Sequence, residues 1–317
     1  MWSKFAFRYI GRQLMSLLIL LFFVSVAAFV LVRLLPGDAA TAYLNSINAP
    51  LTEEAIGEVE KELGLDAPLP VQYGKWIIQV FRGDLGFSYQ TGRPVIEELS
   101  EDLRYTGALA FTALGWVLAL SLILGILSAG NSGGAVDMMI RIFTFLGSAM
   151  PKFWLGFLAV SLFSLRWKLL PVQGAATWKH LILPSLTLAC SYIATYTKLL
   201  RNSILEVQSS SFVLHARARG FSKRFVLVHH VIPNAMTPVF TTLGLHLGGI
   251  LSGSVIVENV FAWPGLGRMC VDAVAARNYP MIQGYILLLS VIFVTANLLC
   301  DLVCAAFNPK FRAGGRT

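Results

Sequence analysis

The chain has 317 residues, of which 56% are apolar and only 13% are charged, and its mean hydropathy is +0.68. This composition lies far outside the range of soluble globular proteins and predicts an all-α protein embedded in a membrane. The net charge of +8 is dispersed over separate short segments rather than gathered on one module, so the sequence predicts no nucleic-acid partner.

Six apolar stretches are long enough to cross the hydrocarbon core of a bilayer as helices, which takes about 20 residues each. They cover residues 13–32, 105–129, 142–165, 180–197, 235–257 and 278–300. The first has a basic start like a secretion signal, but its apolar run is too long for a cleaved signal, so we expect a retained helix. Acidic and basic residues are absent from all but the third stretch, which carries Lys152 next to Pro151.

The distribution of charge predicts the orientation of these helices. If both termini lie in the cytoplasm, the inner segments hold the basic residues Lys4, Arg8, Arg12, Arg141, Lys198, Arg201, Arg217, Arg219, Lys223, Arg224, Lys310, Arg312 and Arg316. Residues 34–104 would then lie outside, and they contain twelve acidic residues against five basic ones. This bias predicts six transmembrane helices with an N-in, C-in orientation.

The chain therefore divides into four predicted parts. Residues 1–33 form the cytoplasmic N-terminus and the first helix, 34–104 a small extracytoplasmic lobe, 105–309 the membrane core, and 310–317 a cytoplasmic tail. In the lobe, Thr52 is placed to cap a helix that stops before Gly64, and a second helix is expected over 70–81, between Pro70 and Gly83. The turn at 128–134 is rich in glycine and serine and is expected to be flexible.

Pro151 lies inside the third apolar stretch. Proline removes a backbone hydrogen bond, so a kinked helix is predicted there. Such a kink can line a transport pathway, although kinked membrane helices without that role are common. Met150 and Pro151 are therefore candidates for a pathway or gate.

The inner segment 200–234 is much longer than the other inner turn, which suggests that a partner docks on it. Two short helices are expected, broken at Gly220, because glycine readily takes the positive φ that ends a helix. Small Ala216 and Ala218 would let a partner approach closely, and Arg217 and Arg219 would meet acidic or carbonyl groups on it. A basic loop that only anchors the topology is the alternative.

This segment resembles the coupling loop of ABC importer permeases. Gly220 is followed thirteen residues later by Pro233 and preceded by Ala216 at four residues, as in that loop. Leu214 and His215 stand where the family's general form has Glu and Ala, and the Ala-Arg-Ala-Arg-Gly wording is instead similar to the dipeptide, oligopeptide and nickel branch. The resemblance implies that residues 215–221 and Pro233 contact an ATPase subunit, namely His215, Ala216, Arg217, Ala218, Arg219, Gly220, Phe221 and Pro233.

Five further stretches resemble the same branch, at 33–38, 63–73, 83–88, 258–268 and 277–280. Together they imply a type I ABC importer permease fold in the bacterial inner membrane. The implied partners are a homologous second permease, two ATP-binding subunits that carry ATP and Mg²⁺, an extracytoplasmic substrate-binding protein and membrane lipid. The resemblance gives this chain no cofactor and no catalytic residue of its own.

The substrate is less well defined than the family. The sequence near 258–265 and 244–248 resembles that of nickel permeases. This resemblance favours nickel or a metal chelate as the substrate, with dipeptide or oligopeptide import as the alternative. His246 lies mid-membrane, where ionisable groups tend to face a pathway, and imidazole is a suitable ligand for Ni²⁺. A neutral histidine hydrogen-bonded to a neighbouring helix is the other interpretation of His246.

Glu258 is expected at the outer end of the fifth helix. Its carboxylate would attract a cation or a peptide amine at an outer gate, or would pair with Arg268 or Arg277 nearby. The stretch from 266 to Pro280 is expected to include a short outer helix that helps to gate the pathway.

Two other classes of protein fit less well. A membrane enzyme would need a recognisable catalytic motif, and the sequence has neither paired intramembrane carboxylates nor a phosphate-binding loop. A channel or secondary transporter would not need the long docking segment and usually carries ion-coupling carboxylates in its helices.

Overall fold

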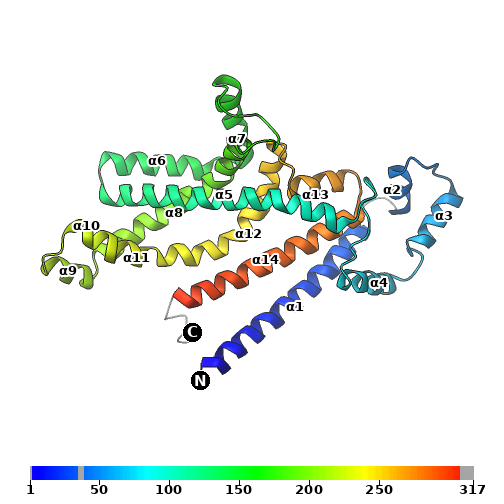
Figure 1. Cartoon of the computed structure of the whole chain (residues 1–317), viewed down its shortest axis with the longest axis horizontal. Helices are drawn as coiled ribbons and strands as arrows, with labels where there is room; N and C mark the ends of the chain where they lie inside the picture. Colours follow the sequence, from blue (N-terminus) through cyan, green and yellow to red (C-terminus); the bar gives the residue numbers. More distant parts are fainter. Residues whose placement is uncertain (1, 35–38, 308–317) are drawn as a thin grey trace. The chain divides into compact units, whose positions relative to one another are not determined.

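The computed structural model describes residues 2–34 and 39–307, and these residues are helical apart from turns, loops and one isolated antiparallel bridge between Phe87 and Pro94. The predicted tail at 310–317 and part of the 33–38 motif lie outside the described residues. The helices are α1 (Trp2–Leu34), α2 (Ala39–Ser46), α3 (Glu53–Glu62), α4 (Leu69–Phe81), α5 (Val95–Gly130), α6 (Ala135–Ala149), α7 (Lys152–Ala159), α8 (Lys179–Gln208), α9 (Ser211–Ala218), α10 (Lys223–Val226), α11 (Ile232–Ala235), α12 (Thr237–Val260), α13 (Leu266–Ala275) and α14 (Tyr279–Phe307) (Figure 1). Two π-helical segments, η1 (Val160–Arg166) and η2 (Leu227–Val231), follow α7 and α10.

The described chain forms two compact units. The first comprises the described residues of Met1–Tyr105 with Gly265–Thr295, and the second comprises those of Thr106–Pro264 with Ala296–Thr317. The first unit has a core in which the start of α5 packs with α13 and the start of α14, through buried Val95, Leu99, Leu266 and Met281.

The lobe helices predicted from the sequence are present in the first unit. Thr52 caps α3 by accepting a hydrogen bond from the Ala55 amide at 3.2 Å, and α4 starts one residue earlier than expected, with Pro70 in its first turn. Gly64 and Gly83 follow α3 and α4 with positive φ values of 64° and 81°. The short helix α2 was not predicted, and it packs against α3 through a small apolar cluster.

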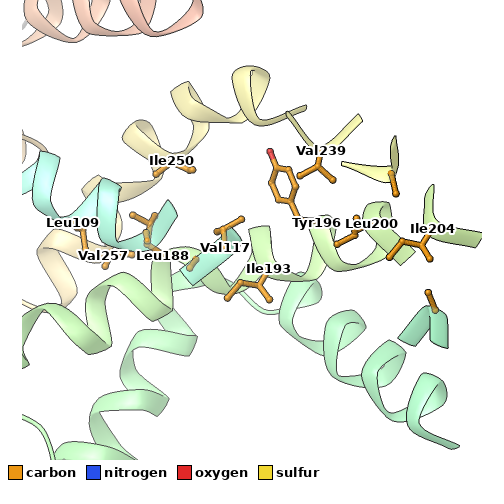
Figure 2. Close-up of a cluster of buried hydrophobic side chains, with 14 of the residues drawn as sticks. Leu109, Val117, Leu188, Ile193, Tyr196, Leu200, Ile204, Val239, Ile250 and Val257 are labelled. Atoms are coloured by element: carbon orange, nitrogen blue, oxygen red, sulfur yellow. The ribbon is translucent and has the colours of Figure 1, made fainter. Parts of the chain in front are cut away.

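The second unit has its core around α8. Figure 2 shows side chains of α5, α8 and α12 meeting there, among them Leu109, Leu188 and Ile250. Tyr196 projects from α8 toward α12, and it is fully buried. The expected short helix after 265 is α13, which belongs to the first unit.

The number of helices that could cross a membrane is smaller in the described chain than the six predicted. Three helices in the described chain are long and apolar enough to cross a membrane, at Leu17–Leu34, Val95–Gly130 and Tyr279–Leu298, and two bent helix pairs raise the number to five at most. The predicted stretch at 180–197 lies within α8, which is not among these spans. Six spans and their orientation stay a prediction.

The prediction for the third apolar stretch needs correction. A kinked continuous helix was expected, but α6 ends at Ala149 and α7 begins at Lys152, with their axes at 110°. Met150 and Pro151 are extended, with ψ values of 134° and 140°. Proline disfavours the helical conformation of the residue before it, so the helix breaks rather than bends.

Candidate functional site

The predicted docking segment consists of two short helical pieces joined by a tight turn. Helix α9 ends at Ala218, and Gly220 follows with a φ of 84°. A Cβ atom at Gly220 would meet nothing within 4 Å, so the need for glycine there is conformational. Ser222 then caps α10 by accepting a hydrogen bond from the Phe225 amide at 3.3 Å. The expected break at Gly220 is confirmed.

The docking segment is anchored on one side and open on the other. Val213, Val226 and Val231 are buried in the core of the second unit. The side chains named for ATPase contact are exposed except for Ala216, which is half-buried; the exposed ones are His215, Arg217, Ala218, Arg219, Phe221 and Pro233. One face of the segment is therefore free to receive a partner.

An aromatic stack on this segment was not predicted. The rings of Phe221 and Phe225 stack with centroids 5.1 Å apart, and those of Phe225 and His229 stack at 4.3 Å. The Arg219 guanidinium lies 5.7 Å from the centroid of Phe221. The rings follow one another at a spacing of four residues, which is the sequence signal that could have indicated the stack, although Phe221 itself precedes the helix.

A buried ion pair, also missed in the sequence, ties α8 to the first turn of α6. Arg201 donates from Nε and Nη2 to the two carboxylate oxygens of Asp137, each at 2.7 Å. Ser128 and the Gly133 amide donate to the same carboxylate, at 2.5 and 3.0 Å. The hydrogen bonds to Asp137, and to a lesser extent its negative charge, raise the pKa of Arg201 above its ordinary value. The turn at 128–134, expected to be flexible, is thus held at both of its ends.

A groove of about 1110 Å³ runs along α6 and α8 beside this ion pair. Its lining includes Arg141, Lys198 and Arg201, with Asp137 as its acidic member, and it extends as far as Ser148. The groove is therefore rich in basic groups along the surfaces of α6 and α8.

The pathway candidate His246 lies in a polar cluster between α8 and α12. Its Nδ1 is 3.1 Å from the hydroxyl of Tyr196, and its ring contacts the rings of Tyr192 and Tyr196, both with centroids at 5.6 Å. Lys152, at the start of α7, places its ammonium 5.0 Å from the centroid of Tyr192. His246 of α12 is thus hydrogen-bonded to a tyrosine of the neighbouring helix α8, as the second interpretation of this residue expected.

The structure offers little support for a metal site at His246. Among the described residues, no group of three or more His, Cys, Asp and Glu side chains could hold a metal ion. Of the other two pathway candidates, Met150 is half-buried and Pro151 is exposed. A ligand role for His246 stays an untested prediction.

Glu258 is fully buried in the second unit rather than open to solvent. Its Oε1 accepts a hydrogen bond from Thr106 at 2.8 Å. Arg268, one of its two expected partners, has its Nε 3.9 Å from Asp272. In this conformation the Glu258 carboxylate therefore does not present itself to an incoming substrate.

Comparison with known proteins places the chain among transporters. A family model described as "Binding-protein-dependent transport system inner membrane component" matches residues 121–313. A companion model for the N-terminal part of such membrane components matches residues 6–110. The chain belongs to this family. It is a permease subunit of an ABC importer and spans the membrane, as the resemblance of its docking segment implied.

Curated relatives match the permease over nearly its full length. It is 39% identical over 305 residues to proteins named glutathione transport system permease protein GsiC in Escherichia coli (strain K12) and Salmonella typhimurium (strain LT2). The match covers 96% of this permease and 98% of each relative.

Solved structures share the fold of the permease at low sequence identity. The inward-facing MetNI methionine ABC transporter matches with a TM-score of 0.56 and 16% identity, over 67% of this permease and 96% of that chain. An amino acid ABC transporter solved with histidines matches with a TM-score of 0.51 and 17% identity, over 68% and 94%. The permease therefore has the helical fold of type I ABC importer permeases.

Proposed function

We propose that this permease forms half of the translocation pathway of an ABC importer for small peptides of the glutathione type. The observation that carries the proposal is the 39% identity over nearly the whole chain to permeases named for glutathione transport. Peptide import was the alternative in the sequence prediction, and it replaces nickel as the preferred substrate class.

The charge of the polar cluster also favours a peptide over a metal ion. The Lys152 ammonium is 5.0 Å from the Tyr192 centroid, which is 5.6 Å from that of His246, so this positive charge lies no more than about 11 Å from the centre of the His246 ring. With an effective dielectric constant of about 20, the repulsion of a divalent cation is about 3 kcal/mol. A Ni²⁺ ion passing here would gain one imidazole ligand, His246, and would be opposed by this electrostatic repulsion of about 3 kcal/mol.

The remaining partners follow from the importer class. A binding protein outside would deliver the peptide to a pathway between this permease and a homologous second one. Two ATP-binding subunits would hydrolyse ATP, while this permease carries out no chemistry itself. Their closure would act on the exposed face of α9, and because α9 follows α8 after only two residues, a push on α9 would reach the core around α8 directly.

An uptake experiment on the complete assembly tests the substrate. Proteoliposomes containing both permeases and both ATPases, with binding protein outside, would be given ATP inside and either ³⁵S-labelled glutathione or ⁶³Ni²⁺. The proposal predicts ATP-dependent accumulation of glutathione and none of nickel. Nickel accumulation without peptide accumulation would refute the proposal and restore the nickel prediction.

A further inference from the structure

Lys152 is a positive charge without an acidic partner in an apolar stretch of the chain. None of the ion pairs within residues 2–34 and 39–307 involves it, and among these residues its ammonium interacts with the ring of Tyr192. It lies at the break between α6 and α7, where the side chain is half-buried and still accessible. A cation in such a place is costly, and unpaired intramembrane charges typically mark a substrate pathway.

Two glycines of helix α12 leave room for the Tyr192 hydroxyl and the Lys152 ammonium. A Cβ atom on Gly249 would lie 2.7 Å from the Tyr192 hydroxyl, and one on Gly253 would overlap the Lys152 ammonium. The two glycines are one helical turn apart, so they form a single strip along one face of α12. Any larger residue at either position would displace a donor from the cluster.

We propose that Lys152, Tyr192 and His246 form a binding site for the carboxylate of the transported peptide. This inference rests on the proposed function and names the part of the substrate that the pathway recognises. The ammonium supplies three donors and the phenol one, and among the residues that the structure describes neither group has a hydrogen-bond partner. A carboxylate is the peptide group that accepts such donors, with the ammonium providing charge-assisted hydrogen bonds.

The chemistry of the neighbouring surface agrees with an anionic ligand. The lining of the groove along α6 and α8 includes Ser148, four residues before Lys152 in the sequence, and Ala194, two residues after Tyr192. Three of its four charged side chains are basic. A carboxylate that reached this groove would meet mainly positive charge.

The test uses variants of this permease in the complete assembly with binding protein and labelled glutathione. Lys152→Met removes the charge, Lys152→Arg keeps it, and Gly253→Ala displaces the ammonium without deleting it. Lys179→Met, an exposed lysine at the start of α8, is the matched control. Stimulation of ATPase activity by the binding protein is measured in parallel, because it reports whether each assembly is intact and coupled.

The inference predicts that Lys152→Met lowers glutathione uptake on the order of tenfold, as expected for the loss of a charge-assisted hydrogen bond, while the stimulated ATPase activity persists. Gly253→Ala should also lower uptake, whereas Lys152→Arg and Lys179→Met should keep most of it. Wild-type uptake by Lys152→Met would overturn the inference, and so would equal losses in the Met and Arg variants, which would indicate a packing role. Neither of these two results would contradict the proposed function as a peptide importer. Absence of glutathione uptake by the wild type would instead refute the proposed function and this inference with it.

Discussion

Gln72 is predicted to hold the lobe helix α4 in place through four hydrogen bonds. Its Oε1 accepts from Nε and Nη2 of Arg33 at 3.0 and 2.9 Å, and its Nε2 donates to the carbonyls of Leu65 and Ala67 at 2.9 and 2.8 Å. The side chain is only 9% exposed, so water cannot readily replace these partners. Gln72→Leu keeps a similar volume and removes all four bonds.

The magnitude follows from the number of bonds and their partners. A hydrogen bond within a protein contributes roughly 0.5–1.5 kcal/mol net, so the loss of four corresponds to about 2–6 kcal/mol. For cooperative units of about 150–250 residues, each kcal/mol shifts the thermal midpoint by roughly 2–4 °C. We therefore expect the midpoint of the unit containing α4 to fall by at least about 4 °C.

The control is Gln79→Leu, the same substitution on the exposed face of the same helix. Both variants would be compared with the wild type in the purified assembly, by thermal unfolding and by the rate of limited proteolysis between residues 39 and 94. Gln72→Leu should unfold at lower temperature and be cleaved faster, and Gln79→Leu should match the wild type. Equal behaviour of the two variants would refute the claim that the Gln72 network holds the lobe.

Three further substitutions test the second unit. Arg201→Met should lower the thermal midpoint by several degrees and more than Arg93→Met, because Asp137 is buried while the partners of Arg93 are exposed; equal shifts would contradict this. Arg217→Glu should abolish copurification of the ATPase subunits while the permease still inserts into the membrane, and wild-type recovery of the ATPases would argue against docking there. Gly220→Val should lower the ATPase activity stimulated by the binding protein, because a left-handed φ of 84° costs a side-chain-bearing residue about 1–2 kcal/mol; unchanged stimulation would show that the turn is dispensable.

Local features of the fold could be predicted from the sequence because the signals lie within a few residues. The cap at Thr52, the turn glycine Gly220 and the end of α4 before Gly83 are examples. The missing element, α2, is only eight residues long, too short to show a clear helical period in the sequence. The break at Pro151 was underestimated because the conformation of Met150 depends on proline sterics as well as on the lost hydrogen bond.

The candidate sites were less predictable because they depend on partners far apart in the sequence. Asp137 and Arg201 are 64 residues apart, and nothing local to either indicates the pair. Lys152 was visible as the one charge within the apolar stretches, but its place beside Tyr192 and Gly253 emerges only when α7, α8 and α12 pack together. The docking segment was predicted in more detail because its helices and turn are contiguous.

The measurement that tests the central claim most directly is the energy source of peptide uptake. Proteoliposomes with the complete assembly would be loaded with ATP or with a non-hydrolysable analogue, and ionophores would collapse all ion gradients. An ABC importer permease for peptides predicts that labelled glutathione accumulates with ATP despite the ionophores and does not accumulate with the analogue. Accumulation driven by an ion gradient without ATP would contradict the account.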